Sequence, residues 1–442
     1  MESSSSLVKA RHHIVFIAGL LTALVLAFSI ETRDYSQVLG NLSFTSTEPI
    51  PFRDARVLTD EEYQWAKIAW QYFENNYQDN TGLVNSVDGY PSTTMWDTAS
   101  YLMALISAQQ LNVITQTEFN LRMEKALVTL SRIPLVENLL PNKAYNTQTL
   151  AMVDYSNKDT PNGIGWSAID VGRILVPMNI LIWKYPKFNR QVNKVLEYWK
   201  VEAMNKEGYL FGARPSPTGD KFDLVQEGRI GYEEYASKAL ALMGRDVFNA
   251  LRYADHLKLI TIDGVEVPTD NRDPAKYHAH NYVVSESYIL DGIEFGSDSI
   301  SRIFAYRVYK AQKNRFDRLG ILTAVSEDNV DQPPYFVYNT VFSDGKEWNA
   351  ISDTGADASQ LKTLSTKAAF GWYALYNTPY TLKLIQGVDT LFNQKKGWYS
   401  GLYERDGKIN TAITANTNGI ILESLAYMQN GALLNIGVDT QL

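Results

Sequence analysis

The chain has 442 residues, of which 45% are apolar and 20% charged, so it is long and apolar enough to bury a large core. Its net charge is −8, and it has no long basic run, which argues against nucleic acid as a partner. Cysteine is absent, which excludes disulfides and thiolate chemistry. Aromatic residues make up 12%, an excess that suits either stacking on sugar rings or a large helical core.

The first residues are typical of a membrane anchor. Lys9 and Arg11 lie in a polar stretch, 1–13, that precedes the apolar run Ile14–Ile30. As a helix this run is about long enough to cross the hydrocarbon core of a bilayer. Positive charge before it predicts a single-pass anchor in a bacterial cytoplasmic membrane, with the body facing the periplasm or the exterior. A cleaved signal peptide is the alternative. Residues 31–58 are polar and are predicted to be a linker.

From residue 59 to residue 442 we expect one all-α domain, an (α/α)6 toroid of six helical hairpins. Apolar residues recur at helical spacing in twelve stretches, and these alternate between one apolar face and nearly continuous apolarity. That alternation predicts an outer and an inner ring of helices. An α-solenoid would require a fixed repeat, which the sequence lacks. The expected helices span Tyr63–Tyr77, Met95–Gln110, Gln116–Arg132, Ser167–Trp183, Lys187–Met204, Tyr232–Met243, Arg245–Leu257, Val284–Phe295, Asp298–Arg318, Leu361–Tyr376, Pro379–Phe392 and Asn418–Gln429.

Long polar links precede the inner helices, and loops of this length in a compact domain are usually functional. We therefore expect the links to gather around the N-termini of the inner helices and to form a cleft there. The five long links are Pro134–Gly165, Glu207–Gly231, Thr261–Tyr282, Leu319–Ser359 and Gly397–Thr417.

Five motifs at the expected starts of inner helices resemble those of a bacterial family of glycoamylase-like domains. They are Thr94–Ser100, Gly165–Arg173, Gly231–Gly244, Ser365–Trp372 and Asn416–Glu423, and the likeness covers nearly all of Asp60–Gly431. That family is a domain of unknown function within the six-hairpin glycosidase superfamily, and related branches cut or rearrange β-1,2-glucans. The resemblance implies a glycoside hydrolase or transglycosylase that acts on a cell-envelope or exported polysaccharide.

Glycoside hydrolysis needs one carboxylic acid to protonate the leaving oxygen and a second carboxylate to activate water or attack the sugar. Glu233 and Glu234 lie in the first turn of an expected inner helix. Glu234 matches the position of the general acid in relatives, and we expect it to face the cleft with a pKa raised by burial. Asp97 and Asp170 are the further catalytic candidates. Each of the four also has a structural interpretation, as a helix-capping residue or, for Asp170, as the partner of Arg173.

Other residues near the expected cleft are candidates for substrate binding. Aromatic rings can stack on sugars, and carboxylates and amides can bind hydroxyls, although Asn residues at helix starts also serve as caps. This set comprises Trp96, Trp166, Tyr232, Arg173, His278, His280, Asp353, Asp357, Glu404, Asn416 and Asn418.

Two alternatives to a hydrolase stay open. His278 and His280 suit a polysaccharide lyase, in which Arg214, Arg229 or Arg272 would bind a uronate carboxylate. The other is a glycan-binding or assembly protein without catalysis. No metal site and no cofactor is predicted.

Overall fold

The computed structural model describes residues 48–219, 221–277 and 280–434. The predicted anchor and most of the predicted linker lie outside these ranges. Within them, no helix is both long enough and apolar enough to cross a membrane.

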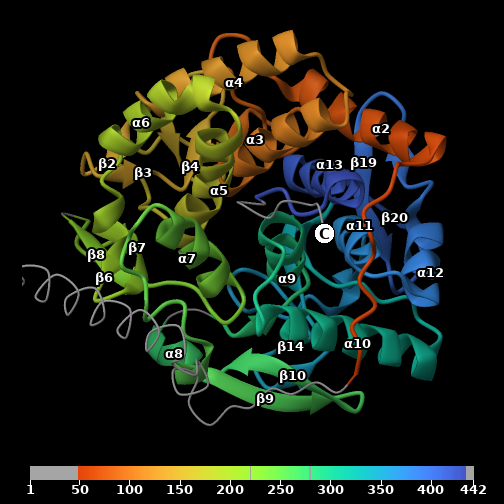
Figure 1. The fold of residues 1–442 in the computed structure, drawn as a ribbon. Helices are drawn as coiled ribbons and strands as arrows, with labels where there is room; N and C mark the ends of the chain where they lie inside the picture. Colours follow the sequence, from red (N-terminus) through yellow and green to blue (C-terminus); the bar gives the residue numbers. More distant parts are fainter. Residues whose placement is uncertain (1–47, 220, 278–279, 435–442) are drawn as a thin grey trace, which may run out of the picture. The chain divides into compact units, whose positions relative to one another are not determined.

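The inner helices of the described residues form a closed ring (Figure 1). Each packs against the next along the chain, and the last packs against the first. Their side chains are buried along most of their length. They are α3 (Met95–Gln110), α5 (Ala168–Lys184), α7 (Tyr232–Leu242), α9 (Glu286–Leu290) with its π-helical continuation Asp291–Phe295, α11 (Thr366–Leu375) and α13 (Ala415–Asn430).

The outer helices pack against this ring and keep a solvated face. In α6, for example, Val192 and Val195 are the residues that are buried. The predicted alternation between half-buried and fully buried helices is therefore confirmed. The outer helices are α2 (Asp60–Asn76), α4 (Gln116–Leu130), α6 (Asn189–Tyr198), α10 (Ser301–Leu319) and α12 (Pro379–Val388), and short helical turns span Pro186–Phe188, Val201–Met204, Tyr253–Asp255, Pro274–Tyr277 (α8) and Ser359–Leu361.

Hydroxyl side chains fix where many of these helices begin. Thr59 forms a reciprocal capping box with Glu62 at the start of α2. Thr94, Ser167 and Thr414 accept the backbone N–H three residues on, at the starts of α3, α5 and α13. The caps of the inner helices lie at the ends where the long links arrive.

The helix predicted over Arg245–Leu257 is wrong. Val247, Ala250 and Tyr253 are buried at helical spacing, but the backbone N–H of Ala250 donates to the carbonyl of Gly208, in the turn between two strands, at 2.8 Å. A tertiary contact therefore takes an N–H that a helix would bond four residues back, and a short turn followed by a strand stands where the fourth outer helix was expected.

The prediction of an all-α domain is also wrong, because the links contain small antiparallel sheets. Long links carry backbone donors and acceptors that need partners, and hairpins supply them. The sheets are β1 (Ser92–Thr94) with β4 (Ala144–Asn146) and β5 (Met152–Val153); β2 (Leu135–Val136) with β3 (Leu140–Pro141); β6 (Asn205–Lys206) with β7 (Tyr209–Pro215) and β8 (Phe222–Gln226); β9 (Leu257–Ile262) with β10 (Val265–Asp270); β11 (Tyr282–Val283) with β14 (Phe342–Ser343) and β15 (Lys346–Glu347); β12 (Glu327–Asn329) with β13 (Phe336–Asn339) and β16 (Ala350–Ile351); and β17 (Thr363–Ser365) with β19 (Gly397–Tyr403), which also pairs with β18 (Phe392–Asn393) and β20 (Ile409–Ile413).

Both described ends of the chain lie at the C-terminal ends of the inner helices. The backbone N–H of Arg53 donates to the carbonyl of Leu375, the last residue of α11. The backbone N–H of Arg56 donates to the carbonyl of Met428, near the end of α13. Leu433 N–H donates to Ile293 in the π-helical segment. Residues 53–56 therefore contact the ring, although they fall in the predicted linker. These contacts cover the end of the ring opposite to the long links.

Candidate active site

The first turns of four inner helices meet at the ring axis. Trp96 of α3 donates from Nε1 to Glu286 Oε1 of α9 at 2.9 Å, and Asn416 Nδ2 of α13 donates to the same oxygen at 2.8 Å. Lys367 Nζ of α11 donates to Asn416 Oδ1 at 2.8 Å and also pairs with Glu286. Lys367 further lies 3.7 Å from Asp328 Oδ1. This buried network shows that the N-terminal ends of the inner helices converge.

A second charged layer lies deeper along the axis. Arg173 of α5 pairs with Glu294 at 3.1 Å and with Glu423 at 3.3 Å, and all three side chains are fully buried. Tyr235 donates its hydroxyl to Glu294. Burial raises the pKa of both Glu294 and Glu423, and the charge of Arg173 opposes that shift. Arg173 therefore pairs with these residues instead of Asp170, and its burial removes it from the predicted substrate-binding surface.

Three other carboxylates near the starts of the inner helices are partly exposed. They are Asp97, Asp170 and Glu227, and we call them the carboxylate cluster. Ser167 Oγ donates to Asp170 Oδ1 at 3.1 Å, and Ala168 N–H donates to Glu227 Oε2 at 2.5 Å. Asp170 and Glu227 therefore share the N-terminus of α5. Glu227, in the link before α7, was not selected from the sequence.

The carboxylate cluster has raised pKa values. Burial first, and the charge of Glu227 second, raise the pKa of Asp170 to about 7. Burial also raises the pKa of Glu227, against the charge of Lys143 and the Ala168 N–H. The pKa of Asp97 is raised by burial and held back by hydroxyl hydrogen bonds from Ser86 and Thr94. Asp170 is therefore the carboxyl group of this cluster that holds a proton near neutral pH.

Aromatic rings surround the cluster. Trp96 is partly exposed, whereas Trp166 is 2% exposed and Tyr232 is 7% exposed. The Trp96 and Tyr232 ring centroids lie 5.5 Å apart in an edge-to-face arrangement. Tyr282 and Tyr338 stack at 4.3 Å, and both are partly exposed. Trp96 thus remains a candidate sugar platform, and the Tyr282–Tyr338 pair adds an aromatic surface that was not selected from the sequence.

Glu233 and Glu234 are buried at the start of α7. Glu234 is 3% exposed and accepts the N–H of Gly231, its own helix cap, at 2.7 Å. Burial and the charge of Glu233 raise its pKa to about 8, as expected. Glu233 pairs with Arg272 at 2.7 Å. Glu234 therefore has the pKa of a proton donor but does not face an open cleft, contrary to expectation.

The remaining candidates serve mainly local structure. Glu404 binds Arg315 through both oxygens, and Asp357 accepts the hydroxyl of Ser359. Asn418 is fully buried and binds backbone groups of Trp398 and Thr414. His280 lies 2.7 Å from Asp344, Asp353 is exposed, and His278 lies outside the described residues. Among the described residues, no group of three His, Cys, Asp or Glu side chains is arranged to hold a metal ion.

Residues 64–431 match the family model described as "Protein of unknown function (DUF3131)". The chain belongs to the DUF3131 family. No curated protein matches the sequence. Among solved structures, this DUF3131 chain is similar to a glucoamylase candidate from Bacteroides caccae, with 12% identity, a TM-score of 0.64, and coverage of 85% of this chain and 94% of that one.

Two endo-β-1,2-glucanases are similar in the same way. The enzyme from Chitinophaga pinensis has 11% identity and a TM-score of 0.62, over 86% of this chain and 94% of its own. The enzyme from Talaromyces funiculosus has 10% identity and a TM-score of 0.58, over 84% of each chain. At these identities the likeness shows a shared fold. The fold is that of the six-hairpin glycosidases, so the resemblance inferred from the helix-start motifs of this DUF3131 protein is confirmed.

Proposed function

We propose that the chain is a glycoside hydrolase, or a transglycosylase with the same chemistry, that acts on a β-glucan at the carboxylate cluster. The observation that carries the proposal is the Asp170–Glu227 pair at the N-terminus of α5, in which burial and like charge keep one proton near neutral pH. The similar structures include a Chitinophaga pinensis glucanase in complex with sophorotriose and glucose, which supports a β-1,2-glucan as the first substrate to test.

The chemistry divides between two carboxyl groups. Asp170, with a pKa of about 7, donates its proton to the glycosidic oxygen, so that the leaving sugar departs as a neutral alcohol. A second carboxylate, Glu227 or Asp97, accepts a proton from the water that attacks the anomeric carbon. In a transglycosylase, a sugar hydroxyl takes the place of that water. Trp96 and the Tyr282–Tyr338 pair supply apolar faces beside these groups.

The geometry favours Asp170 over Glu234 as the acid, and it favours a hydrolase over a lyase. Glu234 is buried against its own helix cap, so a glycosidic oxygen does not reach it without a rearrangement of α7. A lyase would need a cation for a uronate carboxylate. Of the three arginines named for it, Arg272 is engaged by Asp270 and Glu233 and Arg229 donates to Asn281, which leaves Arg214, exposed in β7.

Turnover of a panel of β-glucans, measured by release of reducing ends, tests the proposal. The variant Asp170→Asn keeps the shape of the side chain but cannot deliver the proton, and we expect it to lower kcat by about two to four orders of magnitude. The wild-type kcat/KM should fall as the pH rises through about 7, because Asp170 then loses its proton. Asp317→Asn, on the exposed face of α10, is the control. Near-normal turnover by folded Asp170→Asn would refute the assignment. With a uronate-containing glycan added to the panel, an ultraviolet-absorbing product would indicate a lyase.

We also propose, from the sequence alone, that the body lies outside the cytoplasmic membrane. The support is the apolar run Ile14–Ile30 with basic residues before it. A reporter that is active only in the cytoplasm, fused after Leu442, should be silent in bacterial cells. A bright reporter would contradict this location.

A further inference from the structure

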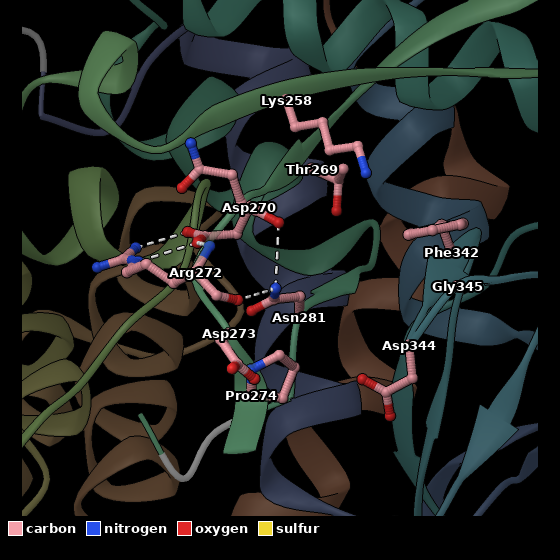
Figure 2. A pocket seen from close by; sticks show the side chains of 11 residues that line it. Lys258, Thr269, Asp270, Arg272, Asp273, Pro274, Asn281, Phe342, Asp344 and Gly345 are labelled. Carbon is pink, nitrogen blue, oxygen red and sulfur yellow. Dashed lines mark hydrogen bonds and ion pairs between the residues drawn. The ribbon is translucent and has the colours of Figure 1, made fainter. Parts of the chain in front are cut away.

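A pocket of about 400 Å³ lies between the end of the β9–β10 hairpin and the β14–β15 turn (Figure 2). It is separate from the carboxylate cluster, none of whose members lines it. Its volume falls in the range of about 300–1,000 Å³ that is usual for small-molecule sites. Its floor is buried and its rim is largely exposed. The floor includes Thr269, Asp270, Arg272 and Asn281, and the exposed rim includes Lys258, Asn271, Asp273 and Asp344.

The floor is held in place by its own hydrogen bonds. Arg272 binds Asp270 through Nε at 2.9 Å and through Nη2 at 2.6 Å, and it reaches Glu233 of α7 with Nη1. Asn281 Nδ2 donates to the carbonyl of Asp270 at 3.1 Å. These bonds pre-organise the floor, so a ligand would not have to order it on binding.

Thr269 provides an independent sign of a ligand. Its side chain is 2% exposed, and its hydroxyl has no hydrogen-bond partner within the described part of the chain. Figure 2 shows this hydroxyl pointing toward the space between Asn281 and Phe342. Buried polar groups are almost always paired, and an unpaired hydroxyl beside a cavity indicates a missing partner there.

The pocket and the carboxylate cluster lie on opposite faces of the short strand pair β11–β14. Strand β11 pairs with β14 so that Tyr282 faces Ser343 and Val283 faces Phe342. Side chains alternate between the faces of a strand, so Asn281 and Phe342 fall on one side and Tyr282 on the other. Asn281 and Phe342 line the pocket, whereas Tyr282 packs against Tyr232 and Tyr338 beside the cluster. The pocket and the carboxylate cluster therefore lie on either side of a single strand, β11.

The pocket chemistry fits a neutral polyhydroxylated ring. Carboxylates and amides alternate around it, and Phe342 and Pro274 offer apolar surface. The positive charge of Arg272 is already matched by Asp270 and Glu233, and Lys258 on the rim is outnumbered by Asp273 and Asp344, which disfavours an anionic ligand. We propose that this pocket is a subsite that binds a sugar residue of the same glycan that reaches the carboxylate cluster. This inference rests on the proposed function.

Two rim carboxylates allow a test that leaves the carboxylate cluster and the buried floor unchanged. Asp273 and Asp344 are exposed, and neither belongs to the carboxylate cluster. In the double variant Asp273→Ala/Asp344→Ala we expect KM for polymeric β-glucan to rise about three- to tenfold, as the net loss of one ordinary hydrogen bond at an exposed rim predicts. KM for the shortest cleaved oligosaccharide and kcat should stay unchanged. Asp317→Ala is the matched control. An equal change for short and long substrates, or no change for either, would overturn the subsite.

A binding measurement separates the failure of this inference from the failure of the proposed function. In affinity electrophoresis with soluble β-1,2-glucan, Asp170→Asn should be retarded, and adding the two rim substitutions should weaken that retardation several-fold. If the wild-type chain cleaves no β-glucan but shows this pattern, the proposed catalysis is wrong and the subsite stands. If the wild-type chain cleaves the polymer and the rim substitutions leave retardation unchanged, the subsite is wrong and the catalysis stands.

Discussion

Replacement of Glu234 by Gln tests whether this buried carboxyl group has a structural or a catalytic role. The side chain is 3% exposed and accepts one backbone hydrogen bond from Gly231, which the amide oxygen of Gln can also accept. The pKa of Glu234 in the folded protein is about 8, compared with an ordinary value of 4.5. Because the folded-state pKa is raised, the stability that protonation provides is present at low pH and is lost as the pH rises through about 8.

The size of the effect follows from this pKa difference. Each pKa unit corresponds to about 1.4 kcal/mol, so between pH 6 and pH 9 the free energy of unfolding of the wild type should fall by roughly 2–3 kcal/mol through this group alone. Glu234→Gln has no charge to bury and should not show that fall. Urea unfolding at pH 6 and pH 9 measures the difference, with Glu124→Gln on the exposed face of α4 as the control.

Turnover by the same variant completes the test. We expect folded Glu234→Gln to keep kcat within about tenfold of the wild type, because the carboxylate cluster is untouched. Parallel pH profiles of stability for the variant and the wild type would refute the burial argument. A loss of two or more orders of magnitude in kcat would instead make Glu234 the general acid and remove that role from Asp170.

Three further substitutions test the site and its buried support. Trp96→Ala should weaken glycan binding by about 1–3 kcal/mol with an unchanged helical circular dichroism signal, whereas Trp166→Ala should mainly lower the urea midpoint, because Trp166 is 2% exposed; the reverse pattern would contradict the assignment of Trp96 as the sugar platform. Lys367→Met leaves the buried carboxylates of Glu286 and Asp328 without their ammonium partner and should reduce the free energy of unfolding by about 3–5 kcal/mol at pH 8. Burial raises the pKa of Asp328 to about 7, so the loss should shrink toward pH 5 as Asp328 protonates, and an unchanged urea midpoint at pH 8 would refute the reasoning.

Local signals in the sequence predicted the helices well, because they act over a few residues. The apolar periodicity over Met95–Gln110 and Ser167–Trp183 predicted α3 and α5 within a residue or two. The same signals failed at Arg245–Leu257, where the spacing of buried residues is helical but the backbone bonds to the turn after Glu207. Whether a periodic segment forms a helix there is decided by a partner about forty residues earlier in the chain, which periodicity does not report.

The site was harder to predict, because its residues come together only when the ring closes. The sequence placed Asp97 and Asp170 correctly at the starts of inner helices, but not Glu227, which belongs to the link before the next inner helix. A local signal could have corrected the expectation that Glu234 faces the cleft. Glu234 is the third residue of α7 after the cap Gly231, and a Glu at that position commonly turns back to bind the cap N–H. That pattern favours a structural role over one in the cleft.

The side chains on the ring axis hold the indole of Trp96 in one orientation. Trp96 is fixed at its edge by the hydrogen bond from Nε1 to Glu286, and on one face by the guanidinium of Arg173, whose carbon lies 4.7 Å from the ring centroid. Glu286 is held by Lys367, and Arg173 is held by Glu294 and Glu423, so the indole is positioned by residues from five helical segments. Burying those charges costs free energy unless every partner is in place. The two charged layers therefore couple the closure of the ring to the orientation of Trp96, which lies directly beside Asp97 in the carboxylate cluster.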